Sequence, residues 1–171
     1  AVLQISFTGM WTFLPFHLMD EPFHLSLQQI SYFYFAYSLG TIGAPLAGWL
    51  SRHYDMSHLR IVGVIILTVG MLVTLNTSLV GIIIGLSLIC LGFFVSHSLA
   101  SATVSNWAET FKGSASSLYL VAYYLGVAIG TTCLTPIWEN FNWKGIITVT
   151  ALLPIFYVII IKFFQRLKEL A

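Results

Sequence analysis

The chain of 171 residues is 58% hydrophobic and only 8% charged, and its mean hydropathy is +0.90. A soluble domain carries about 25% charged residues, so six acidic and seven basic side chains cannot solvate a water-soluble fold of this length. The formal charge of +1 comes without a dense basic patch, which argues against nucleic acid as a partner. The composition therefore predicts an all-α integral membrane protein.

Six apolar segments can be drawn along the chain, each close to the ~20 residues that cross ~30 Å of hydrocarbon. They cover residues 2–19, 29–50, 59–75, 79–102, 114–134 and 143–164. We therefore expect six transmembrane helices with short connections. The first segment has no flanking loop and no basic leader or cleavage site, so we expect a chain cut at its N-terminus rather than a signal peptide. A natural start after removal of an initiator methionine is the alternative.

Basic residues predict the orientation of these helices. Six of the seven fall on one side of the predicted membrane. They follow the second segment, the fourth segment and the last one: Arg52, Arg60, Lys112, Lys162, Arg166 and Lys168. Lys144 alone falls on the other side. The excess of Lys and Arg predicts that the first side is cytoplasmic and that both termini lie there.

A short internal repeat divides the chain in two. The sequence AYSLG at 36–40 matches AYYLG at 122–126, an offset of 86 residues, and each copy lies in the middle segment of a three-segment set. Because three spans are an odd number, the second set is inverted in the membrane. We expect one bundle of two inverted three-helix repeats, 1–78 and 79–171, as in secondary transporters. A match this short also arises by chance in a chain rich in these residue types.

Small residues are frequent in the middle segments. Gly126 and Gly130 form a GxxxG pair, and a second small-residue face contains Gly40, Gly43 and Gly48. Such faces allow helix backbones to approach closely in lipid. The pattern does not distinguish static packing from a seam between helices that move.

Polar and aromatic residues form stripes on four segments. They are Gln4, Thr8, Trp11 and Thr12 on the first, Tyr37 on the second, Ser87, Phe94, Ser98 and Ser101 on the fourth, and Tyr119 and Tyr123 on the fifth. Polar faces in a membrane helix must face other helices or water. These residues are our candidates for the path of an amphipathic organic molecule. Hydrogen bonding between helices is the alternative for each of them.

Ionisable residues are scarce inside the spans. We expect no Asp, Glu, Lys or Arg well inside any segment, and His97 is the only ionisable side chain deep in an apolar run. Its pKa near neutrality suits a proton carrier, but a neutral, hydrogen-bonded structural histidine is the alternative. Cys90 and Cys133 have no metal-ligand spacing, and no motif of a hydrolase or nucleotide enzyme occurs. We expect neither a metal nor a cofactor, and no enzyme activity.

The stretch GAPLAGWLSRHYDMSHLR resembles the hairpin motif of the major facilitator superfamily, Gly-x-Leu-x-Asp-Arg-x-Gly-Arg-Arg. Gly48 and Leu50 match its start, and Arg60 matches a trailing base. Arg52 occupies the acidic position, Asp55 stands at the later glycine, and the loop is longer. A degraded copy is typical of the link between helices eight and nine. LPFHL and KGSASSLYLVAYYLGVAIGTT are similar to helices seven and eleven of bacterial drug-exporter-like members.

The resemblance implies the C-terminal half, helices 7–12, of a secondary transporter that works by alternating access. Its first and fourth helices, 2–19 and 79–102, then line the central path. The implied function is an antiporter for proton-coupled efflux of small organic compounds across a bacterial inner membrane. The implied partners are the lipid bilayer, the substrate, H⁺ and an N-terminal half. The alternative is a self-standing six-helix protein, acting as a homodimeric carrier or a membrane interaction module.

Overall fold

The computed structural model describes residues 1–108 and 110–170, with all their side chains except those at 161, 164, 165 and 167–170. The side chain of Lys168, one of the six basic residues that predict the cytoplasmic side, therefore lies outside the described part of the chain. The described residues form helices and connections without a strand. The helices are α1 (Val2–Met19), α2 (Leu27–Phe33), the 3-10 helix η1 (Tyr34–Tyr37), α3 (Ser38–Leu50), α4 (Met56–Val73), α5 (Leu79–Trp107), α6 (Lys112–Thr132) and α7 (Thr135–Leu170).

Side-chain caps define the starts of three helices. Ser26 and Gln29 form a capping box at α2. Asp55 accepts a hydrogen bond from a backbone N–H in the first turn of α4, and Ser78 does the same for α5. These polar residues satisfy amide groups that a helix start leaves without partners, so they separate the long apolar segments into distinct helices.

Two helices are interrupted. The second predicted segment consists of α2 and α3 with the 3-10 turn η1 between them. Helix α7 breaks at Asn142, whose φ of 51° and ψ of −149° are not helical. Asparagine tolerates positive φ better than most residues do. The break separates a short turn at the start of α7 from the apolar segment predicted to begin at residue 143.

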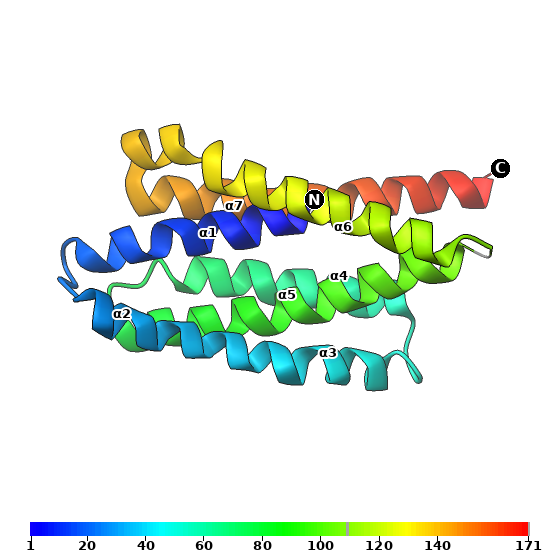
Figure 1. Cartoon of the computed structure of the whole chain (residues 1–171), viewed down its shortest axis with the longest axis horizontal. Helices are drawn as coiled ribbons and strands as arrows, with labels where there is room; N and C mark the ends of the chain where they lie inside the picture. Colours follow the sequence, from blue (N-terminus) through cyan, green and yellow to red (C-terminus); the bar gives the residue numbers. More distant parts are fainter. Residues whose placement is uncertain (109, 171) are drawn as a thin grey trace.

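The helices run along one common direction, and their connections alternate between the two ends of the bundle (Figure 1). Helix α1 packs against α6 and α7, while α5 packs against α3 and α4. Helices α4 and α7 also contact each other. The core between them combines aliphatic and aromatic side chains, and its fully buried members include Met10, Leu14, Leu67, Leu86 and Ile146.

Four helices within the described residues are long and apolar enough to cross a membrane: Met56–Val73, Leu79–Trp107, Lys112–Thr132 and Thr135–Ile160. The expected all-α membrane class agrees with this finding. Helix α1 is not among the four, and it carries polar residues such as Gln4 and His17 along its length. The region 27–50 is not among them because η1 divides it into two shorter helices. The arrangement as six spans therefore stays a prediction.

Candidate functional site

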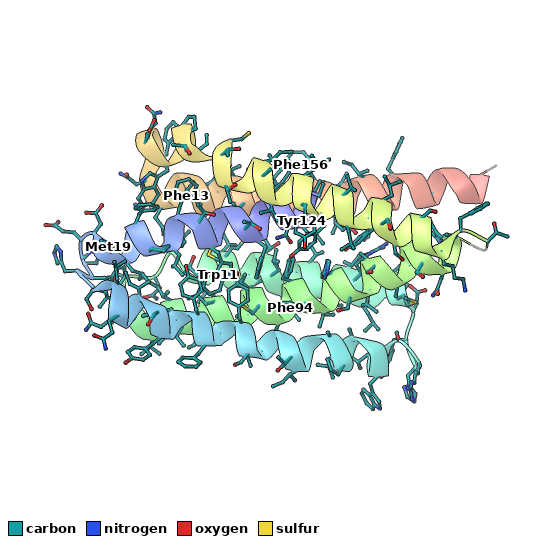
Figure 2. All side chains as sticks on the ribbon, in the orientation of Figure 1. Trp11, Phe13, Met19, Phe94, Tyr124 and Phe156 are labelled. Carbon is teal, nitrogen blue, oxygen red and sulfur yellow. The ribbon has the colours of Figure 1, made fainter. Side chains whose placement is uncertain are left out.

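An aromatic cluster lies where α1, η1 and α5 meet. Its centre is the pair Phe7 and Phe93, which are stacked with their ring centroids 3.9 Å apart. Tyr37 meets Phe7 edge-on at 5.5 Å and lies 4.5 Å from the ring of Trp11. Phe94 closes the cluster with an edge contact to Phe93 at 5.4 Å. Figure 2 shows Trp11 and Phe94 between α1 and the helices α3 and α5. We call these five residues the aromatic cluster.

The aromatic cluster continues into a polar region through His97. The His97 ring stacks on Phe93 with centroids 5.5 Å apart, and its Nδ1 lies 2.8 Å from the Tyr119 hydroxyl of α6. Tyr123 lies one helical turn further along α6, with its ring 5.1 Å from the ring of His97. Two tyrosines of α6 therefore lie beside one histidine of α5.

A cavity of about 70 Å³ opens beside this histidine. Gln4, His97, Tyr119 and Tyr123, all predicted from the sequence, line it together with Tyr157 of α7 and several apolar side chains. Phenol, imidazole and amide groups can each accept or donate a hydrogen bond. The side chains of the cavity therefore offer a polar wall to a small molecule or to a proton-carrying group.

Two buried polar atoms on α1 have no hydrogen-bond partner among the described residues. They are Gln4 Oε1 and Trp11 Nε1. The other amide atom of Gln4 donates to Thr8 Oγ1 at 2.6 Å, and the Thr12 hydroxyl donates to the Thr8 carbonyl at 2.8 Å. A buried polar atom without a partner costs about 1–3 kcal/mol, so these atoms favour a ligand or water that can pair with them.

Three predicted residues of α5 lie away from this region. The Ser87 hydroxyl donates to the Ile83 carbonyl of its own helix at 2.7 Å. Ser87 also lines a separate groove of about 240 Å³ between α5 and the helices α2 to α3. Ser98 and Ser101 are half-buried and line neither this groove nor the cavity beside His97. The serine stripe therefore does not act as one surface in this chain.

The predicted glycine faces differ in what they contact. A Cβ at Gly126 would lie 2.6 Å from the Ala1 carbonyl, and one at Gly130 would lie 2.7 Å from the Ile5 carbonyl. Both glycines thus allow α6 to lie directly against the backbone of α1.

The small-residue face of α3 behaves less uniformly. A Cβ at Gly40 would collide with the ring of Phe94, whereas one at Gly43 would make ordinary contact with Leu91 and Phe94 at 3.4 Å. At Gly48 nothing lies within 4 Å of an added Cβ. The structure does not place Gly48 at a helix contact within this chain, because Gly48 lies on the exposed face of α3 while the neighbouring Ala47 packs against α5.

The hairpin motif requires one correction. We expected Arg60 in the loop after the second segment and no charged side chain well inside a span. Helix α4 begins at Met56, and Arg60 lies inside it with only 9% of its surface exposed. The Ser96 hydroxyl donates to the Arg60 carbonyl at 3.1 Å, and Nε of Arg60 has no partner among the described residues. The loop position expected for Arg60 is wrong, because the Asp55 cap starts α4 at Met56. Arg60 lies only about one turn into this helix, so the absence of charge well inside a span stays a prediction.

The buried guanidinium extends the polar region toward one end of the bundle. Arg60 interacts electrostatically with the hydroxyls of Tyr119 and Tyr157, which line the cavity beside His97. Arg52, in contrast, is exposed in the turn between α3 and α4. The two arginines of the motif therefore differ in environment, and only Arg60 belongs to the candidate site.

Sequence reasoning missed Phe7, Phe93 and Tyr157. Phe7 follows Gln4 by three residues and precedes Trp11 by four, which places it on the predicted stripe, and that spacing was a usable signal. Tyr157 is the only tyrosine in the segment 143–164. No local pattern indicated Phe93, because it lies in a continuous apolar run.

The fold and the site define a polytopic helical membrane protein with a polar and aromatic interior. The profile of the Major Facilitator Superfamily matches residues 1–170, so the chain belongs to this superfamily of membrane transporters and is not an enzyme.

Among curated proteins, an uncharacterized transporter of Buchnera aphidicola subsp. Schizaphis graminum is 33% identical over 93% of this chain and 38% of its own length. The inner membrane transport protein YnfM of Escherichia coli shows the same identity and the same shares. An uncharacterized MFS-type transporter, YybF of Bacillus subtilis, is 29% identical over 81% of this chain and 34% of its own length. This chain thus spans less than two fifths of these relatives. No solved structure matches it.

Proposed function

We propose that this chain is the C-terminal six-helix half of a twelve-helix antiporter that exports small organic compounds in exchange for protons. The observation that carries the proposal is the polar and aromatic region at the meeting of α1 and α5, with His97 and Tyr119 beside a cavity. The relatives extend over more than twice the aligned length, which supports a missing half. The degraded hairpin at 48–60 supports its placement as the second half, and the similarity of LPFHL and KGSASSLYLVAYYLGVAIGTT to helices seven and eleven supports the drug-exporter-like branch.

The packing of the helices supports two inverted repeats, 1–78 and 79–171. Helix α1 contacts α6 and α7, and α5 contacts α3 and α4. In the proposed repeat, α1 corresponds to α5, α3 to α6 and α4 to α7. The contacts of α1 with α6 and α7 therefore correspond to the contacts of α5 with α3 and α4. Such internal pseudosymmetry is typical of transporters in which one repeat moves against the other.

The distribution of charge supports an orientation with both termini in the cytoplasm of a bacterial cell. The connection from α3 to α4, the connection from α5 to α6 and the C-terminus lie at one end of the bundle (Figure 1). This end carries Arg52, Lys112, Lys162 and Arg166. By the positive-inside rule it faces the cytoplasm. In a background with Cys90→Ser and Cys133→Ser, the His53→Cys variant should then react with a membrane-impermeant maleimide only in inside-out vesicles, and labelling in intact cells would contradict the orientation.

His97 is the proposed proton carrier. While its Nδ1 is unprotonated, the Tyr119 hydroxyl donates to it across 2.8 Å. Protonation of Nδ1 reverses this bond, because Nδ1–H then donates and the tyrosine oxygen accepts. The freed hydroxyl hydrogen can turn toward the His97 carbonyl, 3.4 Å away, or toward a molecule in the cavity. Proton uptake therefore changes the hydrogen-bonding pattern that a substrate meets.

The experiment is dye efflux by the full-length protein in proteoliposomes with an imposed pH gradient. The His97→Gln variant should lose the pH dependence of efflux, and Tyr119→Phe should shift it, because each removes one partner of the bond. His53→Gln, in the exposed turn after α3, is the matched control and should behave as wild type. A pH profile unchanged in His97→Gln would return His97 to a purely structural role.

The alternative, a self-standing homodimeric carrier or interaction module, is decided by the gene. About 200 upstream codons with six further spans and an Asp-containing hairpin would exclude it, since ~20 residues are needed for each span. A stop codon directly upstream of the codon for Ala1 would instead contradict the proposed half-transporter.

A further inference from the structure

A groove of about 330 Å³ lies on the outside of the bundle between α4 and α7. Its walls are aliphatic side chains of both helices, and Lys162 lies among its lining residues. Ile65 and Ile159, one from each wall, keep 54% and 56% of their surface exposed. The groove is therefore open to the surroundings of the bundle and separate from the cavity beside His97.

The chemistry inside the groove suits a hydrocarbon chain. Thr68 contributes its only hydroxyl, and this hydroxyl already donates to the Val64 carbonyl at 2.9 Å. The remaining described lining side chains, apart from Lys162, are isoleucine and valine. A polar occupant would leave its own hydrogen bonds unmet there, whereas an acyl chain would not.

Lys162 lies at the level where phospholipid headgroups are expected. Lys144, which lies nearer the start of α7, precedes it by about 27 Å of helix at 1.5 Å per residue. That separation is close to the ~30 Å thickness of the hydrocarbon layer. The two exposed lysines thus mark opposite edges of the membrane. The groove extends from Lys162 to Ile155, about 10 Å along the same helix and into the apolar layer.

We propose that this groove is a binding site for an anionic phospholipid, with an acyl chain between α4 and α7 and the phosphate beside the Lys162 ammonium. Basic side chains at the end of an apolar groove between membrane helices provide this combination of contacts. The site involves neither His97 nor the aromatic cluster, so it is independent of the proposed transport function.

The test measures retained lipid by native mass spectrometry, using the full-length protein in nanodiscs of phosphatidylcholine and phosphatidylglycerol. Wild type should retain phosphatidylglycerol preferentially, and Lys162→Gln should reduce that preference about fivefold, the contribution of one basic residue near an anionic surface. Lys144→Gln, which removes the same charge at the opposite edge, is the control and should leave the preference unchanged. Equal retention in wild type and Lys162→Gln, or an equal loss in Lys144→Gln, would overturn the proposal.

A second pair of variants tests the groove itself. Ile65→Trp should fill the groove and displace the lipid, whereas Val62→Trp, at an exposed position of the same helix that does not line the groove, should not. Lipid retained at the wild-type level in Ile65→Trp would place the lipid elsewhere and refute the site. Size-exclusion elution verifies that each variant is folded. If the wild-type protein binds the lipid but shows no efflux, that result would count against the proposed transport function and not against the lipid site.

Discussion

Replacing Gly130 by alanine tests whether α6 lies directly on the backbone of α1. A Cβ at this position would lie 2.7 Å from the Ile5 carbonyl oxygen and 3.1 Å from the Gly9 nitrogen. Both neighbours are backbone atoms, so no side-chain rotation can relieve the contact. To reach the 3.4 Å at which ordinary contact begins, the two backbones must separate by about 0.7 Å. This separation would loosen the packing on both sides of the contact.

The expected cost is about 1–3 kcal/mol, the range for overpacking a well-packed interior. The same change at Gly48 meets nothing within 4 Å and should stabilise the helix by up to about 1 kcal/mol through its higher helix propensity. One substitution therefore has opposite signs at two glycines. Reversible unfolding in mixed micelles of dodecyl maltoside and dodecyl sulfate measures both values on the full-length protein.

The result that would refute this reasoning is a Gly130→Ala protein at least as stable as Gly48→Ala. It would mean that α1 and α6 are not in backbone contact, and the packing of the first helix would have to be reconsidered. Loss of stability in both variants would instead indicate that Gly48 meets a segment outside this chain.

Three further predictions concern the ends of the helices. Trp143→Phe removes the 3.1 Å hydrogen bond from Nε1 to the buried Thr74 carbonyl, so stability in the same micelle assay should fall by about 1–3 kcal/mol. Asp55→Ala removes the α4 cap and should cost about 1 kcal/mol, whereas Asp55→Asn should retain most of it. A hydrogen bond from the His58 backbone N–H holds the pKa of Asp55 below its usual value. The stability that the charged Asp55 cap contributes should therefore disappear as the pH falls through that lowered pKa, whereas the stability of Asp55→Asn should not change over the same pH range. Exposed Cys133 should react with a small maleimide in the folded protein, and buried Cys90 should react only after unfolding.

Composition and local pattern were sufficient for the class of protein and for most helix boundaries. The segment 2–19 coincides with α1, and the start of 79–102 coincides with the start of α5. These boundaries are local properties, because polar residues such as Asp20 after α1 and Ser78 before α5 separate the apolar runs. The predicted start of the last segment at 143 coincides with the break at Asn142, whereas the 3-10 turn η1 was not predicted.

The candidate site was predictable only in part, for a geometrical reason. The stripe on α1 and the tyrosines of α6 follow helical spacing, and the structure brings Gln4, Tyr119 and Tyr123 to one cavity. Ser87 follows the same spacing rule on α5 but lies beside a different groove. Periodicity assigns a face to one helix, yet it does not say which helix covers that face. Arg60 illustrates the converse, because one capping residue moved it from an expected loop into a buried helix.

The contacts between helices also differ in how easily the helices can move against each other. Helices α4 and α5 meet through paired glycines: a Cβ at Gly70 would lie 2.7 Å from the Gly85 carbonyl, and one at Gly85 would lie 2.8 Å from the Gly70 carbonyl. Backbones this close are locked in register, because sliding would bring larger side chains into the same gap. Helices α1 and α5, in contrast, meet through the stacked rings of Phe7 and Phe93. Flat rings can slide past each other at little cost, so the proposed transport function leads us to expect helix movement at the aromatic cluster and not at the glycine contacts.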